Sequence, residues 1–125
     1  MIQTDINLEL VAILAEINRL LPQLAGFISQ FDKVLVESGI NVMSDTVGNL
    51  SMDAPGDMPK SEMNRISNKV GIIDRLINNS GNTLNELFKK GLSLEESIKR
   101  ENPSYNSQMV EQIQRFKELN GLYKH

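Results

Sequence analysis

The chain has 125 residues, enough for one domain, and its composition of 40% hydrophobic and 23% charged residues argues against a membrane protein and against a wholly disordered chain. The sequence contains no cysteine, so disulfides, thiolate chemistry and cysteine metal sites are excluded. The net charge is −3.

The charge is divided unevenly along the chain. Residues 1–59 carry two basic and eight acidic side chains, whereas residues 60–125 carry eleven basic and eight acidic ones. One interpretation is two separately solvated halves. The other is electrostatic pairing of the halves, or two partners of different charge. We favour the first interpretation because exposed charge pairs contribute little free energy.

Residues 1–39 show the strongest pattern, an apolar side chain every three or four positions. The stripe consists of Ile6, Leu10, Ile13, Ile17, Leu20, Leu24, Phe27, Phe31 and Val34. This heptad spacing predicts a long amphipathic helix of the coiled-coil type. Pro22 lies inside it, and because the stripe keeps its phase across Pro22 we expect one kinked helix rather than two helices. Ser38-Gly39 is a good C-terminal stop.

The same helix has a second apolar side, formed by Leu8, Val11 and Ala15. We expect the C-terminal helices to cover one side and a second protein chain to cover the other, in an oligomer or a hetero-complex. Leu20 and Leu24 are expected at the centre of a helix–helix contact. The predicted protein interface consists of Leu10, Ile13, Ile17, Leu20, Leu24, Phe27 and Phe31.

Residues 40–60 form a linker that contains glycine, proline and several apolar side chains. A solvated tether would be more polar, so we expect this loop to lie on a surface of its own chain or of a partner. Val47, Leu50 and Met52 are its candidate contact residues. A short strand over residues 41–43 is a weaker expectation.

Residues 61–125 are predicted to form a helical head. A second long helix begins at Ser61 and either ends near Asn79 or continues through Gly81. Capping boxes at Thr83 and Ser93 predict two short helices, which end at Gly91 and Pro103. A final helix starts at Ser104 or Asn106 and stops at Asn120-Gly121. Its apolar side consists of Met109, Val110, Ile113, Phe116 and Leu119.

The predicted fold is therefore all-α: a long kinked N-terminal heptad helix, a loop, a second long helix and a C-terminal cluster of short helices, in effectively one domain. The only histidine is the terminal His125, and no nucleophile elbow, phosphate loop or dinucleotide motif is present. We therefore expect no catalytic, cofactor or metal site. The expected function is that of a structural or assembly protein acting through helix–helix contacts, as a small component of a larger complex such as a virion.

The N-terminus lacks a basic segment, and acidic residues interrupt its apolar run. We therefore expect neither a signal peptide nor membrane insertion, and a location in the cytoplasm or within a particle.

Residues 87–98 resemble the turn of a helix-turn-helix unit, with a Gly-Leu-Ser turn between two helical segments. This resemblance implies a nucleic-acid-binding or regulatory protein that uses residues 83–120. Its contact residues would be Lys89, Lys90, Gln108, Gln112 and Arg115. The helix that would read bases carries Glu111 early and its basic residues late, so we favour a cluster of three helices joined by tight turns.

Overall fold

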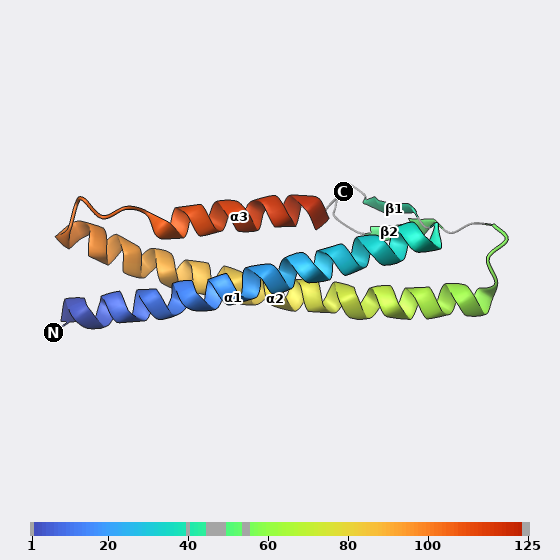
Figure 1. Cartoon of the computed structure of the whole chain (residues 1–125), viewed down its shortest axis with the longest axis horizontal. Coiled ribbons are helices and arrows are strands. Elements are labelled where there is room, and N and C mark those ends of the chain that lie inside the picture. The colour runs from blue at the N-terminus through green and yellow to red at the C-terminus, as the bar shows by residue number, and fades with distance from the viewer. Residues whose placement is uncertain (1, 40, 45–49, 54–55, 124–125) are drawn as a thin grey trace.

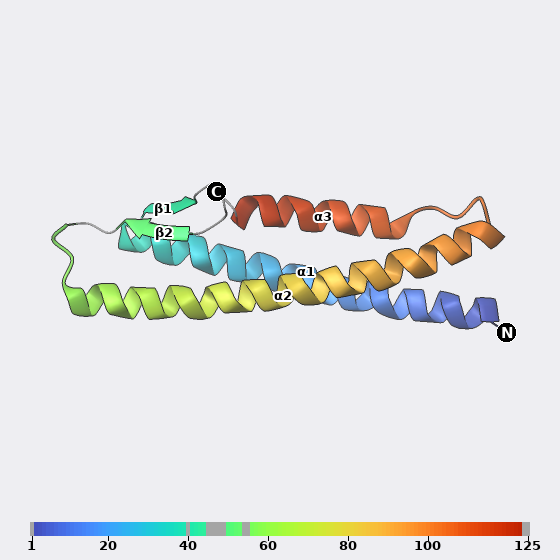
Figure 2. The ribbon, with the colours of Figure 1, turned by 180° about the vertical axis from the view of Figure 1, so that it is seen from behind.

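The computed structural model describes residues 2–39, 41–44, 50–53 and 56–123, with side chains described for residues 5–39 and 56–123. The elements in chain order are α1 (Ile2–Ser38), β1 (Asn41–Ser44), β2 (Leu50–Asp53), α2 (Lys60–Glu101) and α3 (Gln108–Tyr123). Helices α1 and α2 run antiparallel along the whole molecule, and α3 returns alongside them (Figures 1 and 2). The expected all-α fold is confirmed.

Helix α1 follows the heptad stripe. It passes Pro22 as one helix, as the unbroken phase of the stripe predicts. It ends at Ser38, and Gly39 then adopts a left-handed conformation with φ of 66° while its N–H donates to the Val36 carbonyl at 3.2 Å. This conformation favours glycine. With a rise of 1.5 Å per residue, α1 is about 55 Å long and α2 about 63 Å.

The linker between α1 and α2 holds a small antiparallel hairpin of β1 and β2. Asn41 pairs with Asp53 and Ser44 pairs with Leu50. The expected strand at residues 41–43 is confirmed, while its partner β2 was not predicted. Of the candidate contact residues, Val47 lies outside the described residues. Leu50 and Met52 belong to β2, but their side chains lie outside the described part of the chain.

One hydrophobic core joins the three helices. Apolar side chains of α1 pack against a stripe on α2 with the same three-and-four spacing, and Met109 of α3 completes the contact. The core residues of α2 are Ile66, Val70, Ile73, Ile77, Leu84, Phe88 and Ile98. The Phe88 ring of this core lies 5.4 Å, between centroids, from the ring of Phe116, which packs against the core from α3. Because α1 contributes to the core along most of its length, it is an integral part of the bundle.

The prediction of a C-terminal cluster of short helices is wrong, because α2 continues through Gly81 and Gly91 to Glu101. Its apolar stripe keeps its phase across both glycines. Burying that stripe outweighs the cost of about 1 kcal/mol for each glycine in a helix. The turn that resembled a helix-turn-helix unit is thus helix interior.

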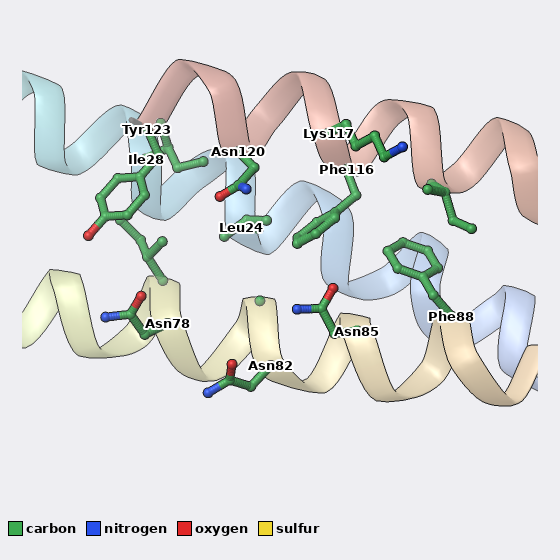
Figure 3. A pocket seen from close by; sticks show the side chains of 13 residues that line it. Leu24, Ile28, Asn78, Asn82, Asn85, Phe88, Phe116, Lys117, Asn120 and Tyr123 are labelled. Atoms are coloured by element: carbon green, nitrogen blue, oxygen red, sulfur yellow. The ribbon is translucent and has the colours of Figure 1, made fainter. Parts of the chain in front are cut away.

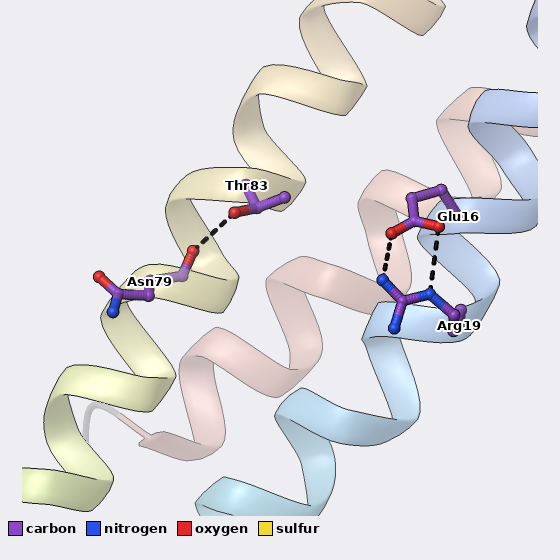
Figure 4. A network of polar contacts seen from close by, with 4 residues as sticks. All are labelled: Glu16, Arg19, Asn79 and Thr83. Atoms are coloured by element: carbon purple, nitrogen blue, oxygen red, sulfur yellow. Dashed lines mark hydrogen bonds and ion pairs between the residues drawn. The ribbon is translucent and has the colours of Figure 1, made fainter.

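The two residues expected to cap those short helices make hydrogen bonds within α2 instead. Thr83 donates to the Asn79 carbonyl at 3.0 Å, one turn back in the same helix (Figure 4). The Ser93 carbonyl accepts a hydrogen bond from the Ser97 hydroxyl at 3.2 Å. Both patterns are typical of helix interiors. The start of α2 also differs from the expectation, since Pro59 rather than Ser61 occupies the N-cap position.

Helix α3 begins at Gln108, a few residues later than expected, and runs through Asn120-Gly121 to Tyr123. Met109 is fully buried, but Val110 is exposed, so its assignment to the apolar side is wrong. Val110 directly follows Met109, and adjacent helical residues point in different directions.

Candidate functional site

The seven residues assigned to a protein interface lie inside the chain's own bundle. Leu10, Ile13, Ile17, Leu20, Leu24 and Phe31 are buried, and Phe27 is partly buried. The helix–helix contact expected around Leu20 and Leu24 therefore exists, but it is made with α2 and α3. The interface assignment needs correction, because side chains enclosed by these helices are not accessible to a second chain.

The other apolar side of α1 remains uncovered. Leu8 is 64% exposed and Val11 is 62% exposed. Ala12 and Ala15 are exposed beside them on the same side of the helix. We call these four residues the outward face of α1. It is the apolar side that α2 and α3 leave bare.

Charged residues border the outward face. Arg19 forms a bidentate pair with Glu16 one turn away, in which Arg19 Nε donates to Glu16 Oε2 at 3.1 Å and the Nη2 atom donates to Oε1 (Figure 4). These hydrogen bonds lower the pKa of the Glu16 carboxyl group. Asp5 lies exposed at the other end of the face. The face is therefore a short apolar strip with acidic and basic residues at its ends.

A groove of about 470 Å³ runs between α2 and α3, with Leu24 and Ile28 of α1 at its floor. We call it the α2–α3 groove. Its apolar lining includes three aromatic rings. Its polar lining is unusual because four of its side chains are carboxamides. The lining residues used below are Asn78, Asn82, Asn85, Phe88, Phe116, Lys117, Asn120 and Tyr123.

Figure 3 shows how the lining side chains are arranged. Phe116 and Asn120 point from α3 toward α2, and Asn85 reaches from α2 toward α3. Among the described residues that line the groove, Lys117 is the one charged side chain. Asn78 donates from Nδ2 to Asp74 Oδ2 at 3.3 Å, at the rim.

The segment of α2 beside this groove is locally unfavourable for a helix. Asn78, Gly81, Asn82 and Asn85 together disfavour the helix by about 3 kcal/mol relative to alanine. All four line the groove. Residues that disfavour the secondary structure in which they lie are often found at functional positions.

Glu95 connects α2 to α3. It is 2% exposed and its carboxylate accepts three hydrogen bonds from the start of α3: from Ser107 Oγ at 2.7 Å, from the Gln108 N–H at 3.1 Å and from the Met109 N–H at 2.9 Å. Lys99 Nζ lies 4.0 Å from the same carboxylate. A negative group at a helix N-terminus accepts hydrogen bonds from backbone N–H groups that have no partner within the helix. It also interacts favourably with the positive end of the helix dipole.

The same region is closely packed. A Cβ atom on Gly91 would lie 2.7 Å from the Met109 sulfur, so the absence of a side chain lets α3 approach α2 there. Burial raises the pKa of the Tyr105 hydroxyl, and the nearby Glu95 charge raises it further. Sequence reasoning missed Glu95. The available signal was its spacing, since it continues the buried series of Leu84, Phe88 and Gly91.

The residues considered for nucleic-acid contact do not form one patch. Lys90 pairs with Glu9 of α1 at 3.3 Å. Arg115 lies with Leu21 and Pro22 at a crevice between α1 and α3, and its Nη1 donates to Gln112 at 3.4 Å. Lys89 and Gln108 are exposed.

Two further features of the described residues bear on function. Among them, no group of three or more histidine, aspartate or glutamate residues is arranged to hold a metal ion. One helix, over Asp5–Ser38, is long and apolar enough by length and composition to cross a membrane, with a mean hydropathy of 1.3 in its most apolar window. A core helix meets the same criterion, and the apolar stripe of α1 is core here.

Comparisons of the chain with protein families, with curated proteins and with solved structures find no match.

Proposed function

We propose that this protein is a non-enzymatic assembly protein that pairs with a second copy of itself through the outward face of α1. One observation carries the proposal: Leu8 and Val11 remain more than half exposed on a helix whose other apolar side is enclosed by the bundle. Leaving adjacent apolar side chains in water is unfavourable, and exposed apolar patches of this kind are typical of interaction sites.

The total exposed surface supports a partner. The chain exposes 8332 Å², whereas a compact monomer of 14.0 kDa exposes about 6,700 Å². The excess of about 1,600 Å² is twice the roughly 800 Å² that each partner contributes to a standard protein–protein interface. Two long helices with a thin core leave enough surface for a dimer contact and for a further one.

The partner is a second copy because the outward face is complementary to itself. When two α1 helices cross antiparallel between Val11 and Ala12, Leu8 of each copy meets Ala15 of the other. A large side chain then fits against a small one on both sides of the two-fold axis. Val11 and Ala12 meet their own counterparts near the axis, where alanine permits close approach.

The charges at the ends of the face suit the same arrangement. In the antiparallel crossing, Asp5 of one copy lies beside Arg19 of the other, on the same flank of the helix pair. A parallel crossing would place like charges opposite each other, which is unfavourable. The charged rim therefore favours the antiparallel orientation.

Light scattering across a range of protein concentrations tests this proposal. We expect the wild-type chain to approach twice the 14.0 kDa mass of one chain. Val11→Lys should return it to one chain at the same concentration with unchanged helicity, because a lysine at the axis of the dimer would be buried without a partner. Val36→Lys is the matched control, since Val36 is 80% exposed on the same helix but outside the outward face. A wild-type protein that stays monomeric at every concentration would contradict the proposal.

A further inference from the structure

We infer that the α2–α3 groove binds an extended, acidic peptide segment of another protein. This site is independent of the proposed dimer contact, because it opens between α2 and α3 and not on the outward face of α1. The inference rests on the size of the groove, on its carboxamides and on its charge.

The dimensions fit a short stretch of extended chain. The groove volume of about 470 Å³ lies within the range of natural ligand sites. Its lining on α2 extends from Ile77 to Phe88, which is about 16 Å along the helix. About five residues of an extended chain, at about 3.3 Å each, span that length.

The carboxamides favour a peptide backbone as the ligand. An asparagine side chain offers one acceptor and a pair of donor hydrogens, and so can pair with both polar groups of a peptide unit. Asn78 and Asn82 are one turn apart, about 6 Å along the axis, which is close to the two-residue repeat of an extended chain. Asn78, Asn82 and Asn85 are all exposed, and Asn85 points across the groove toward α3 (Figure 3).

A helical ligand would not use these groups. The backbone donors and acceptors of a helix are already bonded within the helix, so a groove for a helix is lined by apolar side chains. An extended segment has free N–H and C=O groups along both edges. Asn85 of α2 and Asn120 of α3 stand on opposite sides of the groove and can pair with those two edges (Figure 3).

The charged and aromatic residues of the groove indicate which side chains the ligand carries. Lys117 is the one charged residue among the described lining, and Lys89 continues the series of Asn78, Asn82 and Asn85 by helical spacing. Both are exposed, so they attract a carboxylate. Phe88, Phe116 and Tyr123 provide the apolar surface against which a neighbouring side chain packs. The expected ligand therefore alternates apolar and acidic residues.

Selection from a random linear peptide library displayed on phage tests the inference with the full-length protein. We expect enrichment of peptides that carry aspartate or glutamate beside an apolar residue. Fluorescence titration of the most enriched peptide should show about a fivefold to tenfold weaker affinity for Asn85→Leu, because a ligand amide loses its partner. Lys117→Glu should shift the selected peptides from acidic to basic ones.

Asn79→Leu is the matched control. Asn79 is exposed and adjacent to Asn78 but does not line the groove, so this variant should bind the peptide as the wild type does. Circular dichroism checks that each variant keeps its helicity. The inference is overturned by no enrichment, by equal effects of Asn79→Leu and Asn85→Leu, by enrichment of helix-forming peptides, or by tighter binding of a single-stranded oligonucleotide at the groove.

Discussion

Glu95→Ala is expected to lower the free energy of unfolding by about 3 kcal/mol. The substitution removes the acceptor of three hydrogen bonds at the start of α3, and the N–H group of the buried Met109 then has no partner away from water. Hydrogen bonds to a charged group contribute about 1.5–3 kcal/mol, and a lost cap costs about 1 kcal/mol. Urea unfolding followed by circular dichroism measures the change, and hydrogen exchange should report earlier opening of α3 than of α1.

Glu96→Ala is the matched control for this prediction. Glu96 is the next residue on α2, is exposed and pairs with Arg100 at 3.2 Å. An exposed pair of this kind contributes little, so we expect a change within about 0.5 kcal/mol. If the two variants lost the same stability, the connection of α3 to Glu95 would not be what holds this helix in place.

Ile17→Ala is expected to lower the free energy of unfolding by about 2–5 kcal/mol. Ile17 is fully buried in the core that joins the three helices, so the smaller side chain leaves a cavity and forfeits the burial of the removed atoms. Thermal and urea unfolding measure the loss, at a concentration low enough to keep the wild-type chain monomeric.

Leu8→Ala separates the two sides of α1. Leu8 is exposed, so under the same dilute conditions its removal should change the unfolding free energy by less than about 0.5 kcal/mol. At high concentration it should weaken self-association, whereas Ile17→Ala should act on folding. A large loss of stability in dilute Leu8→Ala would mean that the outward face belongs to the core of a single chain.

Hydrophobic spacing was sufficient to predict where the helices pack. The stripe from Leu10 to Phe31 is buried as its phase predicts, and Gly39 ends α1. Local signals were sufficient for these features because each one follows from a few neighbouring residues. Which element covers the stripe depends on how distant parts of the chain pack, and the spacing of neighbouring residues does not contain this information. The stripe is therefore predicted to contact another chain, although α2 and α3 cover it.

The interior of α2 could not be predicted from its local signals. Thr83, Gly91 and Ser93 are good boundary residues in isolation, but Ile77, Leu84, Phe88 and Ile98 are buried in the core that joins the three helices, and this tertiary burial outweighs the local preference. The α2–α3 groove was missed for a related reason. Asn78, Asn82 and Asn85 are typical helix breakers by composition, and only the position of α3 gives them a shared surface.

The central claim is that two copies meet through the outward face of α1, and disulfide trapping tests it most directly. The chain has no cysteine, so one introduced cysteine is the only thiol in each copy. Ala12 lies near the two-fold axis of the proposed pair, where two cysteines fall within bonding range. We expect Ala12→Cys to form a covalent dimer rapidly under mild oxidation, and Val36→Cys, which is also exposed on the same helix, to do so slowly. Equal rates for the two variants would contradict the proposed contact.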